Sequence, residues 1–196
     1  MAQSRHHYER AFENYLRACR LPYIAVSEAR KALLPETARG RDRLPRLGPW
    51  TDAPPSLKSF DFVVYAPAPG GNLLIDIKGR RIANSTRNGS PLAAGRLECW
   101  VTQEDVDSLT RWESLFGEGF AGAFVFVYWC DAQPPDALFQ EVFEERGRWY
   151  AVRSIRVRDY AACMKTRSAR WGTVDLPRAD FERLSVPFVS ATAPTL

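Results

Sequence analysis

Two aspartates stand inside apolar runs of this sequence, where a carboxylate needs a specific partner. Asp61 lies in the run from Phe60 to Tyr65, and Asp76 lies in the run from Leu73 to Lys78. A buried carboxylate is costly unless it is paired, hydrogen-bonded or bound to a metal ion. Two carboxylates in an oxygen-rich setting suit magnesium, a hard cation that keeps several waters and binds substrate phosphate. The chemistry that these residues suggest is metal-assisted hydrolysis of a phosphate ester.

A lysine follows the second aspartate in the triplet Asp76-Ile77-Lys78. Side chains alternate between the two faces of a strand, so Asp76 and Lys78 should point one way while Ile77 enters the opposite layer. Asp61 joins them only if the hairpin register brings it beside Asp76. Lys78 could then position the attacking water or stabilise the charge that develops on the phosphate.

An amphipathic helix is expected over Arg5 to Arg20, upstream of both aspartates. Its acids Glu9 and Glu13 lie one helical turn apart and can project from the same face. Either acid could complete a metal shell, directly or through water. The helical spacing of the apolar residues predicts this element, with one face formed by Tyr8, Phe12, Tyr15, Leu16 and Cys19.

The remaining elements alternate between strands and helices, which predicts one α/β domain over residues 1–196 with a mixed sheet. Thr102 can cap a helix, with Asp105 in a weaker form of the capping box. Residues 30–55 and 79–95 contain helix and strand breakers and are expected to be loops. The other expected elements are strands over Tyr23–Val26, Phe60–Tyr65, Leu73–Lys78, Ala121–Cys130 and Trp149–Arg158, a helix over Thr102–Phe116, and a helical turn over Tyr160–Lys165.

Charge is distributed unevenly along the chain. Residues 78–96 contain five basic residues and no acid, and residues 146–171 contain eight basic residues against Asp159 alone. Between residues 97 and 145, eleven acids face only Arg111. This segregation favours a positive side that can steer a polyanion such as nucleic acid. The alternative is that the charge runs are simply solvated faces.

Composition favours a folded, cytoplasmic protein. With 45% apolar and 12% aromatic residues the chain can bury a core. The longest apolar run, Ala121 to Cys130, is too short to span a membrane, and the first residues lack the order of a signal peptide. The four cysteines are far apart and the two histidines are adjacent, so structural zinc and a disulfide framework are not expected. The cysteines are predicted to be buried, reduced thiols.

The order of an acid-bearing helix, a strand aspartate and then Asp-x-Lys on the next strand resembles the PD-(D/E)XK nuclease superfamily. That superfamily includes Holliday-junction resolvases and many restriction enzymes. The resemblance covers about Tyr8 to Cys130 and implies a restriction-endonuclease-like core, αβββαβ, with a central mixed sheet flanked by helices. The stretch from His7 to Glu13, HYERAFE, also resembles the signature of a narrower bacterial group, the HYExAFE proteins. This second resemblance implies membership and not mechanism.

The superfamily resemblance assigns roles residue by residue. It places the metal ligands at Asp61, Asp76 and Ile77, and it makes Lys78 the lysine of the motif. Phe60 stands where the proline that names the motif would stand, a departure that many members share. The implied cofactor is Mg²⁺, which Mn²⁺ could replace.

The same resemblance extends to the two helices that flank the strands. Glu9 best matches the glutamate of the first helix, with Glu13 as the alternative. Gln103 resembles a glutamine that some branches use near the phosphate. The implied partner is nucleic acid, with DNA preferred over RNA, and cutting both strands often implies a homodimer in this superfamily. Internal and terminal cutting both remain open.

Three functions are therefore weighed. The first is a metal-dependent nuclease, the second is a catalytically inactive nucleic-acid-binding protein on the same fold, and the third is an interaction domain whose acids form buried ion pairs. Trp149, Tyr150 and Trp171 are interleaved with basic residues and could stack on bases. The other tryptophans in apolar patterns, Trp100, Trp112 and Trp129, are predicted to lie in the core.

Overall fold

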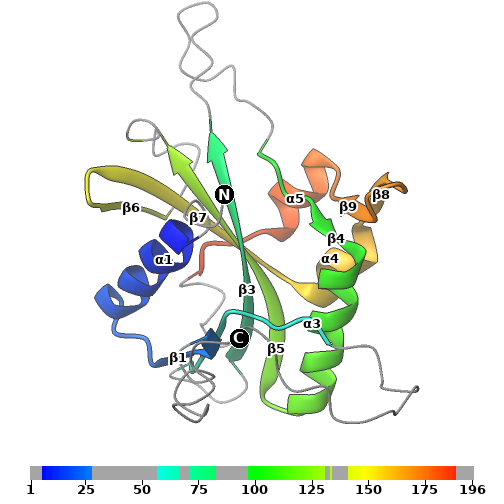
Figure 1. The fold of residues 1–196 in the computed structure, drawn as a ribbon, viewed down its shortest axis with the longest axis horizontal. Coiled ribbons are helices and arrows are strands. Elements are labelled where there is room, and N and C mark those ends of the chain that lie inside the picture. Colours follow the sequence, from blue (N-terminus) through cyan, green and yellow to red (C-terminus); the bar gives the residue numbers. More distant parts are fainter. Residues whose placement is uncertain are drawn as a thin grey trace, which may run out of the picture.

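A six-stranded mixed sheet runs through the centre of the computed structural model (Figure 1). The structure describes residues 6–27, 57–66, 71–82, 97–130, 133 and 141–188. In the strand order β1-β2-β3-β5-β7-β6, the pair β3 and β5 is parallel and the other neighbours are antiparallel. The strands are β1 (Tyr23–Ala25), β2 (Phe62–Val64), β3 (Asn72–Ile82), β5 (Phe120–Cys130), β6 (Val142–Glu145) and β7 (Arg148–Arg156).

Helices cover both faces of this sheet, so the expected mixed α/β architecture is confirmed (Figure 1). One face carries α1 (His6–Ala18), and the other carries α3 (Gln103–Phe116), α4 (Val157–Cys163) and α5 (Arg178–Leu184). A smaller antiparallel sheet has the order β4-β9-β8. Its strands are β4 (Val101–Thr102), β8 (Lys165–Ser168) and β9 (Thr173–Asp175).

Alternation along β3 divides the core into two layers. Ile75 packs with Phe12 and Leu16 beneath α1, whereas Leu74 packs with Leu109 beneath α3. The central strand β5 is buried on both faces, as its continuous apolar run predicts. Even-numbered side chains of β3 therefore face α3, which determines where a charged residue on this strand can find partners.

Strand β3 is longer than the sequence predicts. We expected a loop from Gly79 onward, but every residue from Asn72 to Ile82 pairs with β5, up to the partner Cys130. The parallel ladder outweighs the low strand propensity of a glycine followed by two arginines. The rest of the predicted loop lies outside the described residues. Strand β2 pairs only with Leu73 to Ile75, so among the described strands β3 has no neighbour on that side beyond Ile75.

Several other boundaries also differ from expectation. Strand β7 ends at Arg156 and α4 begins directly at Val157, earlier than the predicted helical turn. Strands β6, β8 and β9 and helix α5 were not predicted, because each is too short to show a clear apolar period. The predicted loop over residues 30–55 lies outside the described residues. No helix in the described residues is long and apolar enough to cross a membrane.

The four cysteines are free thiols with different surroundings. Cys99 and Cys130 are buried, as predicted. Cys19 is exposed and Cys163 is half-buried, so the prediction of burial is wrong for these two. Cys19 lies just past the end of α1, where the chain turns away from the core.

Candidate active site

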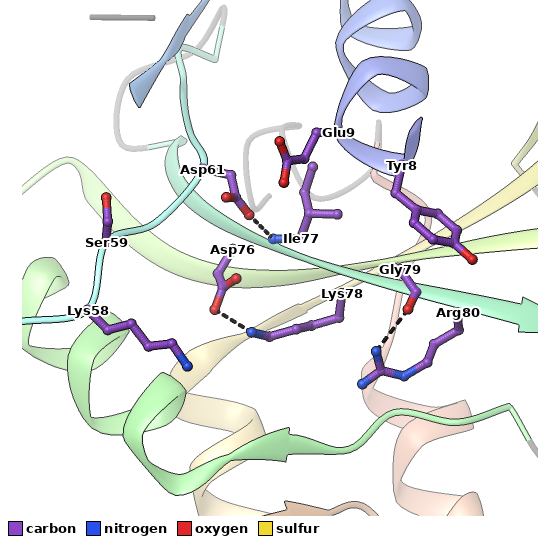
Figure 2. A pocket seen from close by; sticks show the side chains of 10 residues that line it. All are labelled: Tyr8, Glu9, Lys58, Ser59, Asp61, Asp76, Ile77, Lys78, Gly79 and Arg80. Atoms are coloured by element: carbon purple, nitrogen blue, oxygen red, sulfur yellow. Dashed lines mark hydrogen bonds and ion pairs between the residues drawn. The ribbon is translucent and has the colours of Figure 1, made fainter. Parts of the chain in front are cut away.

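A cavity of about 550 Å³ opens beside β3, where β2 no longer covers it (Figure 2). Residues from α1, from the segment before β2 and from β3 line it. The cavity brings together the five residues first assigned to catalysis or metal binding from the sequence, which are Glu9, Asp61, Asp76, Ile77 and Lys78, and it excludes Glu13 and Gln103. The full lining comprises Tyr8, Glu9, Lys58, Ser59, Asp61, Asp76, Ile77, Lys78, Gly79 and Arg80.

The hairpin register places Asp61 beside Asp76. Phe62 pairs with Ile75 in the antiparallel ladder, and the Asp61 N–H donates to the Ile75 carbonyl at 2.7 Å. Asp61 is therefore opposite Asp76, and its Oδ2 accepts a hydrogen bond from the Ile77 N–H at 2.7 Å. The condition on which the predicted site depended, a shared location for the two aspartates, is met.

Lys78 is held in a chain of ion pairs on the α3 face of the sheet. Its buried Nζ lies 2.8 Å from Asp76 Oδ2 and 2.9 Å from Asp105 Oδ2. Asp105 is nearly fully buried, and its Oδ1 lies 2.5 Å from Nζ of Lys58. Asp76 and Lys78 thus point to one face, as alternation predicts, while the Ile77 side chain packs in the other layer.

Helix α3 fixes Asp105 through its first turn. Thr102 is the N-cap residue, and its Oγ1 accepts from the Asp105 N–H at 3.1 Å. Asp105 Oδ2 in turn accepts from the Thr102 N–H at 2.9 Å, which completes a capping box. The same carboxylate therefore caps the helix and binds two lysines.

The segment that carries Lys58 is hydrogen-bonded to residues of α3 that follow the first turn of this helix. The Trp112 indole N–H donates to the Lys58 carbonyl at 2.9 Å, and the Lys58 N–H donates to Ser108 Oγ at 3.3 Å. Phe60 then packs edge-on against Trp112, with ring centroids 5.4 Å apart. These contacts hold the lysine at the rim of the cavity and lead the chain into Asp61.

The pKa values of Asp61 and Asp76 are raised, whereas the pKa of Asp105 is lowered. Burial, together with the nearby charges of Asp76 and Glu9, raises the pKa of Asp61 from 3.8 to about 7. Burial also raises the pKa of Asp76, although Lys78 acts against this change. Burial would raise the pKa of Asp105 as well, but Lys78 and Lys58 outweigh it and hold this pKa well below the usual range. Burial thus disfavours the charged forms of both Asp61 and Asp76, and a nearby cation would favour them.

Glu9 and Glu13 face different surroundings, although they lie one turn apart on α1. Figure 2 shows Glu9 reaching from α1 toward Asp61 and the strand at Ile77. Glu13 Oε1 instead accepts hydrogen bonds from Arg17 at 2.7 Å and from the Tyr23 hydroxyl at 2.8 Å. Of the two alternatives, only Glu9 lines the cavity.

A glycine allows α1 to approach the strand this closely. A Cβ atom at Gly79 would lie 2.2 Å from Cδ2 of the Tyr8 ring, so only a residue without a side chain fits beneath the ring. Tyr8 immediately precedes Glu9. The close contact between Tyr8 and Gly79 therefore determines how near Glu9 stands to the two aspartates.

Gln103 does not reach the cavity. Its side-chain amide donates to Asp107 Oδ1 at 2.9 Å on the exposed surface of α3. The role near the phosphate that the resemblance implied for this residue has no support in its position. Lys58 and Arg80 occupy the cavity wall instead.

Three residues of the site were missed by the sequence reasoning. Asp105 was identified only as a cap, and Lys58 follows a proline-containing stretch without periodicity. Arg80 fell in an expected loop, yet its guanidinium donates to the Gly79 carbonyl at 2.9 Å and to the Trp100 carbonyl at 2.5 Å. A sequence signal existed only for Asp105, because the capping box fixes the direction of its side chain.

The donor set suits a hard cation that keeps part of its water shell. In the described residues, no group of three or more His, Cys, Asp or Glu side chains is gathered closely enough to hold a metal by itself. Two carboxylates can bind Mg²⁺ with waters completing the shell. A strand residue directs its N–H and C=O to the same edge, so the Ile77 carbonyl lies on the edge where its N–H meets Asp61. The raised pKa of Asp61 is what a nearby cation would reverse.

The surroundings of several aromatic side chains differ from those predicted. Trp129 is only partly buried, and the guanidinium carbon of Arg81 lies 4.6 Å from its ring centroid. The guanidinium carbon of Arg80 lies 4.3 Å from the ring centroid of Trp100. Tyr150, for which base stacking was one alternative, is buried, whereas Trp171 is 71% exposed.

Comparison of the chain with protein-family models, with curated proteins and with solved structures finds no match.

Proposed function

We propose that this protein is a metal-dependent nuclease of the PD-(D/E)XK type that hydrolyses phosphodiester bonds in DNA. The observation that carries the proposal is the meeting of Asp61 and Asp76 beside Lys78 at the uncovered edge of β3. The element order α1, β1, β2, β3, β4, α3, β5 supports it, since without β4, which belongs to the smaller sheet, it follows the αβββαβ order of a restriction-endonuclease-like core. Cleavage of both strands of a duplex would be carried out by a homodimer.

The proposed metal ligands are the carboxylates of Asp61 and Asp76 and the main-chain carbonyl of Ile77. Glu9 would accept a hydrogen bond from a water of the metal shell. Bound Mg²⁺, or Mn²⁺ in its place, would lower the pKa of a coordinated water and polarise the scissile phosphate. The two aspartates would orient the group that they bind, and their burial would exclude competing bulk water.

Lys78 acts in this proposal as a fixed cation. Its ammonium group is paired with Asp76 and Asp105, so it can stabilise negative charge that develops on the phosphate without moving. Asp105 is a positioning residue, because it touches Lys78 and not the reacting phosphate. Lys58 at the rim and Arg80 on the wall add positive charge where a polyanion would enter.

Cleavage assays test the proposal directly. Supercoiled plasmid, single-stranded DNA and branched DNA would be incubated with the full chain and Mg²⁺ or Mn²⁺. We expect metal-dependent cleavage that falls at least about 100-fold in Asp76→Asn and Lys78→Ala, the size typical of losing one electrostatic group from an active site. Asp107→Asn on the exposed side of α3 is the matched control and should cleave normally. Undiminished cleavage in both site variants would contradict the assignment.

A second candidate function is nucleic-acid binding without turnover. It is favoured by the pairing of Lys78 with Asp105, which engages the lysine, and by the absence of a three-ligand group in the described residues. This candidate predicts salt-sensitive DNA binding that Asp76→Ala leaves intact or strengthens, since it removes a negative charge. Calorimetry that detects no Mg²⁺ binding, together with no cleavage, would favour it over the nuclease.

A further inference from the structure

A second cavity, of about 500 Å³, opens between the start of α1 and the hairpin that joins β6 to β7. It lies on the other side of the first turns of α1 from the candidate active site. Tyr8 and Glu9 line the active-site cavity, whereas His7 and Arg10 line the second. The polar lining of this second cavity comprises His7, Arg10, Glu145, Arg146, Arg148 and Tyr150.

The second cavity carries a surplus of positive charge. Three arginines face a single acid, Glu145, whose Oε1 already accepts from Asn14 at 2.8 Å and lies 3.3 Å from Arg146. In the part of the chain that the structure describes, neither Arg10 nor Arg148 pairs with a carboxylate. Burial and the nearby Arg148 lower the pKa of His7, so its ring is neutral at pH 7. Two guanidinium groups therefore have no carboxylate partner among the described residues, and Arg148 is instead hydrogen-bonded to the Tyr150 side chain.

The hairpin turn keeps an arginine in a conformation that disfavours it. Glu145 pairs with Arg148, which leaves Arg146 and Gly147 as a two-residue loop with φ of 52° and 73°. Positive φ at both positions is the pattern of a type I′ turn, in which asparagine followed by glycine is preferred. An arginine in the left-handed region costs on the order of 1 kcal/mol, and such strain gathers at functional sites. The turn conformation does not explain an arginine at position 146, so we attribute the residue to its charged side chain, which lines the cavity.

Arg148 is oriented by an aromatic ring. Its guanidinium carbon lies 5.1 Å from the centroid of Trp129, and Arg81 lies 4.6 Å from the same ring. Arg81 follows Arg80, which lines the active-site cavity, and the two side chains lie on opposite faces of β3. Figure 1 shows this end of β3 beside the end of β5, and the sheet order places β7 on the other side of β5.

We propose that the second cavity binds a backbone phosphate of the same nucleic-acid strand whose scissile phosphate enters the candidate active site. The identity of the strand rests on the proposed function. Arginine forks match the oxygens of a phosphate group with paired hydrogen bonds, which makes this lining better suited to a phosphate than to a simple halide ion. The cavity would then fix the direction in which the strand crosses α1.

The test compares DNA binding by the full chain and by arginine variants. Fluorescence anisotropy with labelled single-stranded and duplex oligonucleotides, in the absence of metal, gives Kd and its dependence on salt. Arg146→Asn and Arg148→Ala should each weaken binding by about fivefold and reduce the slope of log K against log salt by about one. Arg178→Ala is the matched control, since Arg178 is exposed on α5 and pairs only with Glu182 among the described residues.

Arg146→Asn separates binding from folding. Asparagine suits the first position of a type I′ turn, so the Tm of this variant should equal or exceed that of the wild type while its DNA affinity falls. Unchanged affinity and salt slope in both Arg146→Asn and Arg148→Ala would overturn the proposal. Competition with inorganic phosphate adds a second arm. If inorganic phosphate occupies the cavity and oligonucleotides do not displace it, the assignment to a nucleic-acid strand fails.

Failure of this proposal can be told apart from failure of the nuclease. If the wild type cleaves DNA and the two arginine variants bind and cleave as it does, the cavity proposal is wrong and the nuclease stands. If the wild type never cleaves but the arginine variants lose DNA affinity, the cavity proposal holds and the nuclease is wrong.

Discussion

Lys78 and Asp105 form a buried ion pair, 2.9 Å from Nζ to Oδ2, between the central sheet and the first turn of α3. Through this pair, one carboxylate both caps a helix and positions a lysine of the candidate site. Asp105 completes a capping box with Thr102, and it also determines where the lysine of the candidate site lies. Stability and function should therefore respond together to changes at this carboxylate.

Asp105→Ala should destabilise the fold by about 3 kcal/mol, because it leaves a buried lysine without one partner and removes a helix cap. Urea denaturation measures the change in the free energy of unfolding. Asp107→Ala, on the exposed side of the same helix, should change that free energy by no more than about 0.5 kcal/mol. Equal effects of the two substitutions would show that the ion pair contributes little.

The raised pKa of Asp61 predicts an unusual pH dependence of stability in the metal-free protein. Its pKa rises from 3.8 to about 7 on folding, so between these values the folded state holds a proton that the unfolded chain has released. Folding stability should therefore decrease as the pH rises through this window, by up to about 4 kcal/mol from this group alone.

Urea titrations with a chelator present, between about pH 4 and pH 8, measure this dependence. Asp61→Asn should reduce the decline, because an amide does not titrate, and leave the part that the raised pKa of Asp76 contributes, while Asp107→Asn should keep all of it. Mg²⁺ should restore stability to the wild type at the upper end of the range but not to Asp61→Asn. Parallel stability curves for the wild type and Asp61→Asn would refute the assignment of the shift to this carboxyl.

Gly79→Ala should displace the start of α1. The new Cβ would meet the Tyr8 ring at 2.2 Å, and such overpacking costs about 1 to 3 kcal/mol. Thermal unfolding of Gly79→Ala, Tyr8→Ala and the double variant tests the contact. The cost of Gly79→Ala should shrink when the ring is absent, and additive effects would show that the two residues do not interact.

Glu9 and Glu13 should behave differently when each is changed to glutamine. Glu9→Gln should lower the rate of DNA cleavage by about tenfold or more, since it alters a group that lines the cavity. Glu13→Gln weakens a partly exposed pair with Arg17 and alters the contact with the Tyr23 hydroxyl, so it should leave that rate unchanged, with a loss of stability below about 1 kcal/mol. Cleavage rates measured under single-turnover conditions decide the matter, and a reversed order would move the helix acid of the site to Glu13.

Local patterns were sufficient to predict α1, α3 and β5 and the common direction of Asp76 and Lys78. The apolar periodicity of a helix and the alternation of a strand are properties of neighbouring residues. The position of Asp61 depends on the register of the β2–β3 pair, and local sequence patterns do not determine that register. Lys58 could not be predicted, because its place follows from hydrogen bonds to Ser108 and Trp112, fifty or more residues away.

The end of β3 shows more clearly what local sequence patterns do not predict. Gly79 and the two arginines after it have the composition of a loop, and only the eleven-residue pairing with β5 makes them a strand. The second cavity was equally inaccessible, because His7 and Arg148 are brought together from opposite ends of the chain. Its arginines were visible in the sequence only as part of a basic run.

The long parallel ladder between β3 and β5 also has a consequence for how the candidate site is assembled during folding. A parallel pair requires a crossover connection, and here that crossover includes α3 with Asp105. Contacts of such high sequence separation form slowly, because the loop-closure entropy is lost before the pairing compensates for it. The ion pair between Lys78 and Asp105 joins β3 to α3, so it forms only once these two elements have packed together. The β2–β3 pair, in contrast, brings Asp61 beside Asp76 through neighbouring strands, so the two halves of the candidate site depend on contacts of different sequence separation.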